Sequence, residues 1–193
     1  MARDRAACPE AAPLRLFVAV DVPDDVSLAI GAAIEPFREA FPKARWVPIE
    51  NWHVTLKFLG RTWPRLVDWV HEQVRDVAAS HDGFRVRVSG LGAFPSPRRA
   101  RVVWAGLDDP SNRLAEIALA LDAAMAREFE GEKRAFTPHL TVARSDPPIA
   151  LPADFGEVPV GSEPFAIDRV VLYRSHLRRP APLYEALETF SLR

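Results

Sequence analysis

The sequence is poor in cysteine, has almost no net charge and contains no long apolar segment. Cys8 is the one cysteine among 193 residues, which excludes an internal disulfide and a cysteine-built zinc site and fits a reducing compartment. No apolar run approaches the roughly 20 residues of a membrane helix. Residues 1–13 contain arginines but not the apolar stretch of a secretory signal. We therefore expect a cytoplasmic protein with no membrane partner, monomeric by default, with residues 1–13 as a disordered leader.

A formal net charge of −1 argues against a broad surface for indiscriminate nucleic-acid binding. The basic residues nevertheless occur in clusters: Arg98, Arg99 and Arg101; Lys133 and Arg134; Arg174, Arg178 and Arg179. Each cluster taken alone fits solvated loop arginines as well as it fits a rim that binds phosphate. Such a rim on a nearly neutral body suits a small or terminal phosphate better than a long duplex.

Hydrophobic periodicity predicts an α+β fold in one domain, residues 14–193. Apolar or alternating runs predict strands at Leu14–Val20, Trp46–Val47, His53–Leu59, Phe84–Val88, Val102–Leu107, His139–Arg144, Phe165–Tyr173 and Tyr184–Phe190. Apolar stripes at helical spacing predict helices from about Pro23 to Phe41, Pro64 to Ser80 and Asn112 to Phe129. Neither a regular βαβ rhythm nor a glycine-rich phosphate loop is present.

The triplet His-x-Thr occurs twice, at His53–Thr55 and His139–Thr141, each in an alternating run. In both copies a basic residue, an aromatic residue and a proline precede the histidine. Strand alternation places His53, Thr55 and Lys57 on one face, and Val54, Leu56 and Phe58 on the other, core-facing side. If the two strands face each other across a groove, the two imidazoles can flank one phosphorus atom.

This pattern points to phosphoester hydrolysis. In-line attack needs a base on the attacking oxygen and an acid on the leaving oxygen, and histidine can serve as either near neutral pH. Threonine hydroxyls and an arginine can hold the non-bridging oxygens, where charge develops. The remaining histidines, His71, His81 and His176, have no such context, and we expect structural roles for them.

The segments LRLFVAVDVP, RWVPIENWHVTLKFLG, LGAFPSPRRARVVWAG, FTPHLTVAR and YRSHL…PLYEALETF resemble the RNA 2′,3′-cyclic phosphodiesterase (2′-5′ RNA ligase) family of the two-histidine phosphoesterase superfamily. The resemblance implies a bilobal fold in which two antiparallel sheets line a central cleft with helices outside. It also implies hydrolysis of RNA 2′,3′-cyclic phosphate ends, on a tRNA fragment or an oligonucleotide, to 2′-phosphates without metal or other cofactor. Reversible 2′-5′ ligation is a further possible activity.

By the same resemblance, His53 is the proton donor and His139 the proton acceptor. Thr55 and Thr141 bind phosphate oxygens, and Arg144 binds the substrate. Strict alternation would place Arg144 on the face opposite His139, so a bulge or strand end must redirect it if it joins the site.

Two other hypotheses remain at this point. The protein could be a module that binds RNA ends or nucleotides without chemistry. It could also be a metal hydrolase with histidine ligands, although neither motif has an adjacent carboxylate and no His-Glu-x-x-His pattern occurs.

Overall fold

The structure, a computed structural model, describes residues 12–160 and 162–193. The predicted leader, residues 1–13, therefore lies almost wholly outside the described residues. The three described α-helices are α1 (Asp24–Ala40), α2 (Val67–Ala79) and α3 (Arg113–Met125). The strands are β1 (Leu14–Asp21), β2 (Arg45–Trp46), β3 (His53–Thr62), β4 (Phe84–Phe94), β5 (Ala100–Asp108), β6 (His139–Ile149), β7 (Phe165–Ile167), β8 (Arg169–His176) and β9 (Leu183–Ser191).

The strands form two antiparallel groups. The spatial order is β7-β4-β5-β6-β3-β1-β8-β9, with β2 paired to β6. One lobe contains β1, β3, β8 and β9, and the other contains β2, β4, β5, β6 and β7. The pair Val54–Leu140, between β3 and β6, is the registered contact that joins the lobes. The α+β class and the antiparallel sheets are thus confirmed, and the two sheets are continuous at one point.

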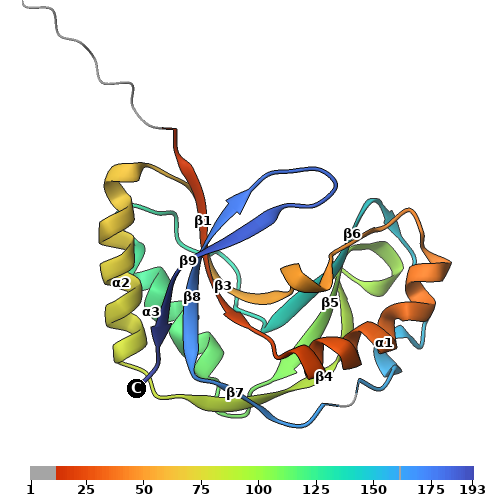
Figure 1. Ribbon diagram of the computed structural model, residues 1–193. Helices are drawn as coiled ribbons and strands as arrows, with labels where there is room; N and C mark the ends of the chain where they lie inside the picture. Colours follow the sequence, from red (N-terminus) through yellow and green to blue (C-terminus); the bar gives the residue numbers. More distant parts are fainter. Residues whose placement is uncertain (1–11, 161) are drawn as a thin grey trace, which may run out of the picture.

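The helices lie outside the sheets, as expected (Figure 1). α2 and α3 lie side by side and cover the lobe that contains β1, β3, β8 and β9. α1 lies beside the other lobe, where Phe37 packs edge-on against Phe155 with ring centroids 4.8 Å apart. None of the described α-helices lies over the sheet surface between the lobes, where β3 meets β6.

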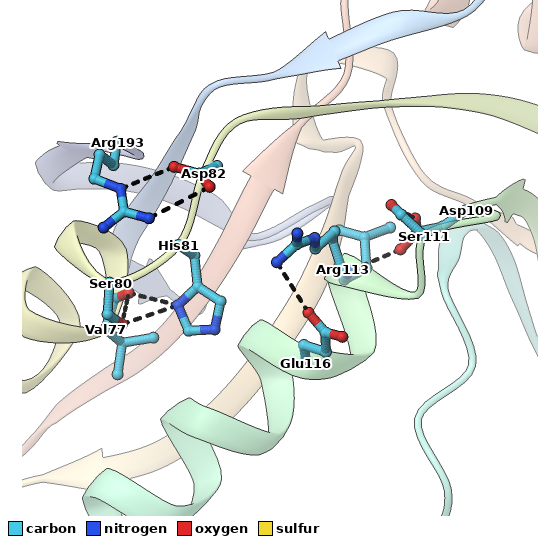
Figure 2. Close-up of polar contacts among 10 residues, drawn as sticks. Val77, Ser80, His81, Asp82, Asp109, Ser111, Arg113, Glu116 and Arg193 are labelled. Carbon is cyan, nitrogen blue, oxygen red and sulfur yellow. Dashed lines mark hydrogen bonds and ion pairs between the residues drawn. The ribbon is translucent and has the colours of Figure 1, made fainter.

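The end of the chain is fixed to the C-terminal end of α2 (Figure 2). His81 donates from Nδ1 to the Val77 carbonyl at 2.7 Å, and Arg193 pairs with Asp82 at 2.9 Å. Since a helix leaves its last carbonyls without partners, His81 satisfies one of them. His71 contacts Glu188, and His176 contacts Glu185 at 2.7 Å. All three of these histidines thus make contacts away from the His-x-Thr motifs.

One prediction for β3 is wrong. Lys57 does not share a face with His53 and Thr55, because the register with β1 skips Leu56. This bulge buries both Leu56 and Lys57, while Phe58, predicted to be in the core, is 64% exposed. Lys57 instead contacts Asp122 of α3 and donates to the Glu130 carbonyl at 2.9 Å.

Candidate active site

The two His-x-Thr triplets lie on neighbouring strands at the junction of the lobes. Val54 and Leu140 are the middle residues of the triplets and are paired in antiparallel register. This register places His53 across from Thr141, and Thr55 across from His139. Side chains directly opposite in such a pair have Cβ atoms about 5 Å apart. The strands therefore do not face each other across a groove. They present both histidines and both threonines from one surface, while Val54 and Leu140 are fully buried behind it.

Both imidazoles are held in the same way. His53 Nδ1 lies 2.9 Å from the Asn51 carbonyl oxygen, and His139 Nδ1 lies 2.7 Å from the Thr137 carbonyl oxygen. A carbonyl oxygen can only accept, so Nδ1 carries the hydrogen in each ring. In the neutral form, each Nε2 then has a free lone pair. Two equivalent nitrogens are thus available to exchange protons with a ligand.

His53 lies among aromatic side chains. Phe17 stacks on it with ring centroids 4.8 Å apart, and Tyr184 contacts it edge-on at 5.2 Å. Burial lowers the pKa of His53 to about 4, although the Asn51 carbonyl and Asp21 oppose this shift. The charge of Arg144 lowers the pKa further. His53 is therefore neutral at pH 7 in the free protein.

His139 has a comparable environment on the other lobe. Phe94 contacts the ring edge-on at 5.1 Å, and Trp104 at 6.2 Å. Burial lowers the pKa of His139, the Thr137 carbonyl opposes the shift, and Arg144 adds to it. Both imidazoles are thus poised to accept a proton when an anion enters.

Arg144 lies on the surface that carries the histidines, because β6 contains a bulge. In the pairing with β5, Thr141 is opposite Trp104 and Ala143 is opposite Val103, so Val142 is skipped. Val142 and Ala143 are consequently both buried. Arg144 returns to the face of Thr141, and its charge acts on both histidines. Strict alternation of side chains along β6 would therefore place Arg144 on the wrong face of the sheet.

Sequence reasoning missed several residues beside the motifs. A cavity of about 270 Å³ lies next to His53, lined by Asp21, Glu50, Asn51, Trp52, Tyr173, Tyr184 and Ala186. The Tyr173 hydroxyl donates to Asp21 at 2.7 Å. Arg45 of β2 lies directly opposite Arg144. No local pattern marks these residues, because strand pairing between distant segments places them near the histidines.

Within residues 12–160 and 162–193 there is no cluster of three or more His, Cys, Asp or Glu side chains that could hold a metal ion. The described helices include none that is both long and apolar enough to cross a membrane.

Two imidazoles, two hydroxyls and an arginine on one surface are the groups that a paired-histidine site for a phosphoester requires. Comparison with known proteins agrees. Residues 23–179 match the family model described as the 2′-5′ RNA ligase superfamily.

Curated relatives and solved structures support the same assignment. An RNA 2′,3′-cyclic phosphodiesterase of Thermus thermophilus is 36% identical, with 93% of this chain and 91% of the relative covered. One of Methanothermobacter thermautotrophicus is 30% identical, with 93% and 99% covered. The crystal structure of Escherichia coli LigT with NADP+ has a TM-score of 0.73 at 27% identity, with 93% and 98% covered. The chain belongs to the 2′-5′ RNA ligase superfamily.

Proposed function

We propose that this protein is an RNA 2′,3′-cyclic phosphodiesterase that opens a terminal cyclic phosphate to a 2′-phosphate without a metal ion. The observation that supports this most is the antiparallel pairing of the two His-x-Thr triplets, each with its Nδ1–H held by a carbonyl. A pair of Nε2 atoms on one surface suits in-line displacement at phosphorus. Its relatives with this name support the RNA substrate.

In the proposed reaction, the oxygen of water attacks phosphorus while the bond from phosphorus to O3′ breaks. His139 Nε2 takes the proton of the attacking water, and protonated His53 gives its proton to O3′. The hydroxyls of Thr55 and Thr141 and the guanidinium of Arg144 hold the non-bridging oxygens. One ring gains a proton and the other loses one, so exchange with solvent restores both rings before the next turnover. Reversing these steps with an RNA hydroxyl in place of water would give 2′-5′ ligation.

The proposed substrate is a tRNA fragment or short oligonucleotide with a cyclic end, and the proposed setting is the cytoplasm. The presence of a single cysteine supports the cytoplasmic setting. We further propose that residues 14–193 form one domain that acts as a monomer. The buried side chains of both lobes belong to one core cluster, which supports a single folding unit.

The direct test incubates the protein, in excess chelator, with an oligoribonucleotide that ends in a 2′,3′-cyclic phosphate, and follows the product by phosphorus NMR. We expect a 2′-phosphate. A 3′-phosphate would retain the paired-histidine chemistry and reverse the assigned roles of His53 and His139. Binding without any product would favour the alternative, a module that only recognises RNA ends.

Substitution separates catalysis from folding. We expect His53→Ala and His139→Ala each to lower kcat/KM by about 10²- to 10⁴-fold while the proteins stay folded. His81→Ala is the matched control, because His81 lies at the end of α2 and should leave turnover intact. Near-normal turnover in either active-site variant would contradict the assignment.

A further inference from the structure

The sheet surface that carries the histidines continues into a row of arginine and aromatic side chains. On β1, Arg15 and Phe17 lie on the same face as the His53 ring, which stacks on Phe17. Arg15 is the register partner of Arg61 on β3, so the two guanidinium groups project from neighbouring strands on that face. Phe58, the partner of Phe17, lies between them and the catalytic pair.

Two bulges in β3 produce this arrangement. The skip at Leu56 turns Phe58 to the site surface, and a second skip at Leu59 restores Arg61 to it. Gly60 follows the second skip with a φ of +64°, a conformation that glycine adopts without strain. The exposed Phe58 and Arg61 are thus aligned with Thr55 along about 20 Å of strand. This length exceeds what a single nucleotide requires.

A structural role in ion pairs does not explain why Arg15 and Arg61 lie opposite each other. Like charges directly opposite each other destabilise a sheet, and within the described part of the chain neither arginine forms an ion pair. Elsewhere in the sheet a cross-strand arginine has an acidic partner: Arg87 lies opposite Asp108, with a contact of 2.8 Å. A further like-charged pair, Arg45 and Arg144, includes the proposed phosphate-binding arginine.

The exposed ring of Phe58 is a second feature of this surface. Phe58 is 64% exposed, and its ring lies 6.1 Å from that of Phe17, whose own surface is buried. An exposed aromatic ring beside arginines is the combination that binds single-stranded nucleic acid, since bases stack on the ring while the cations contact the backbone. Arg15 is close enough to the site that its charge acts on Tyr184.

We propose that Phe58, Arg15 and Arg61 form a subsite for single-stranded RNA upstream of the terminal nucleotide, with a base on Phe58 and backbone phosphates on the two arginines. This inference rests on the proposed function, because it extends the same site. It assigns the protein to the ends of RNA chains in preference to free nucleoside cyclic phosphates.

Equilibrium binding tests the subsite independently of turnover. A labelled tetraribonucleotide with a terminal 2′-phosphate is compared with a nucleoside 2′-phosphate by fluorescence anisotropy and competition, at several salt concentrations. We expect Arg15→Ser/Arg61→Ser to reduce the preference for the tetranucleotide at least tenfold. Its salt slope should fall by about 0.7 for each backbone phosphate that the variant no longer binds. We expect Phe58→Leu to reduce the same preference about tenfold.

The matched control is Arg113→Ser/Arg127→Ser, which removes the first residue of α3 and an arginine two residues after its end, both in ion pairs with glutamates. It should leave the preference and the salt slope unchanged. Equal losses in the two double variants, or no preference for the tetranucleotide in the parent protein, would overturn the subsite. The protein could also open no cyclic phosphate and still prefer the tetranucleotide, with the preference lost in the Arg15/Arg61 and Phe58 variants. That result would reject the proposed function and keep the subsite.

Discussion

At the scale of single residues, the two proposed catalytic histidines differ in burial more than in hydrogen bonding. Both donate Nδ1–H to a carbonyl two residues earlier in the chain. His53 is the more desolvated ring, since Phe17 covers one face and Tyr184 an edge. Desolvation disfavours the imidazolium, so protonation of His53 depends on an anion nearby. Binding of a phosphodiester supplies that charge.

The first prediction concerns the rate as a function of pH. Both pKa values are lowered in the free protein, that of His53 to about 4. The form with one charged and one neutral imidazole therefore peaks on the acid side of the usual imidazole value, about 6.5. We expect a bell-shaped profile of kcat/KM whose alkaline limb lies below about pH 6.5. The alkaline limb of kcat should lie higher, because bound phosphate raises the pKa of the ring it contacts. If the alkaline limbs of kcat and kcat/KM fell at the same pH, bound phosphate would not raise the pKa of the ring as expected.

The second prediction concerns stability as a function of pH. The pKa of His53 is lower in the folded protein than in the unfolded chain, so the unfolded chain binds the extra proton. The contribution of His53 is fully present above about pH 6.5 and is lost as pH falls toward about 4, by up to about 3 kcal/mol. In urea titrations, His53→Ala should therefore lose less free energy of unfolding across this range than the parent protein. An identical loss in both proteins would show that the ring is not desolvated in solution.

At the scale of elements, bulges and glycines place the side chains of the site. Bulges at Leu56 and Val142 occur one residue after Thr55 and Thr141, in equivalent positions of the two motifs. Each turns an additional side chain to the surface that carries the histidines: Phe58 on one lobe and Arg144 on the other. Two similar strands thus present an aromatic ring on one side and a cation on the other.

Gly92 provides the third prediction. A Cβ at this position would overlap with the indole of Trp104, which lies across the strand beside His139. Gly92→Ala should displace the indole, destabilise the protein by about 1–3 kcal/mol and lower kcat/KM. Thermal unfolding and steady-state kinetics measure the two effects.

The control for Gly92→Ala is Gly31→Ala in α1. A Cβ there meets Ile49 at an ordinary 3.6 Å, and alanine is the better helix former. We expect Gly31→Ala to stabilise the protein by about 0.4–1 kcal/mol with activity unchanged. If Gly92→Ala behaved like Gly31→Ala, the indole would not be confined as described.

At the scale of the whole molecule, contacts between distant segments assemble the site. Asn51, just before β3, donates from Nδ2 to the Pro182 carbonyl at 2.8 Å, in the loop between β8 and β9. Its own carbonyl accepts from His53. One residue therefore links the orientation of the His53 ring to the hairpin that supplies Tyr173 and Tyr184.

The fourth prediction follows from this link. Asn51→Ala should remove the anchor of the β8–β9 loop, increase amide hydrogen exchange at residues 177–181 and raise KM severalfold, because Tyr184 loses its position against His53. The global free energy of unfolding should fall by about 1 kcal/mol, the usual contribution of one hydrogen bond. Unchanged exchange in the loop would show that the strands hold the hairpin without this contact.

Much of the fold and part of the site follow from local sequence. The apolar stripe of Val70, Val74 and Val77 predicts α2, and the alternation of Val54 and Leu56 with His53 and Thr55 predicts β3. The predicted helix from Asn112 to Phe129 ends earlier, at Met125, and the predicted strand from His139 to Arg144 continues to Ile149. Ends of elements depend on what packs against them, which local periodicity does not contain.

The sequence by itself determined the element types, the antiparallel class and the two His-x-Thr motifs, because propensity and periodicity act over a few residues. Only the tertiary structure decided that Val54 pairs with Leu140, that Lys57 is buried, and that Arg144 joins the histidines. These features depend on the register between two strands whose His-x-Thr motifs lie 86 residues apart in the sequence. They also depend on bulges that form where these strands pair with their neighbours. A pleated strand alternates by default, and only its pairing partner can show where that alternation is interrupted.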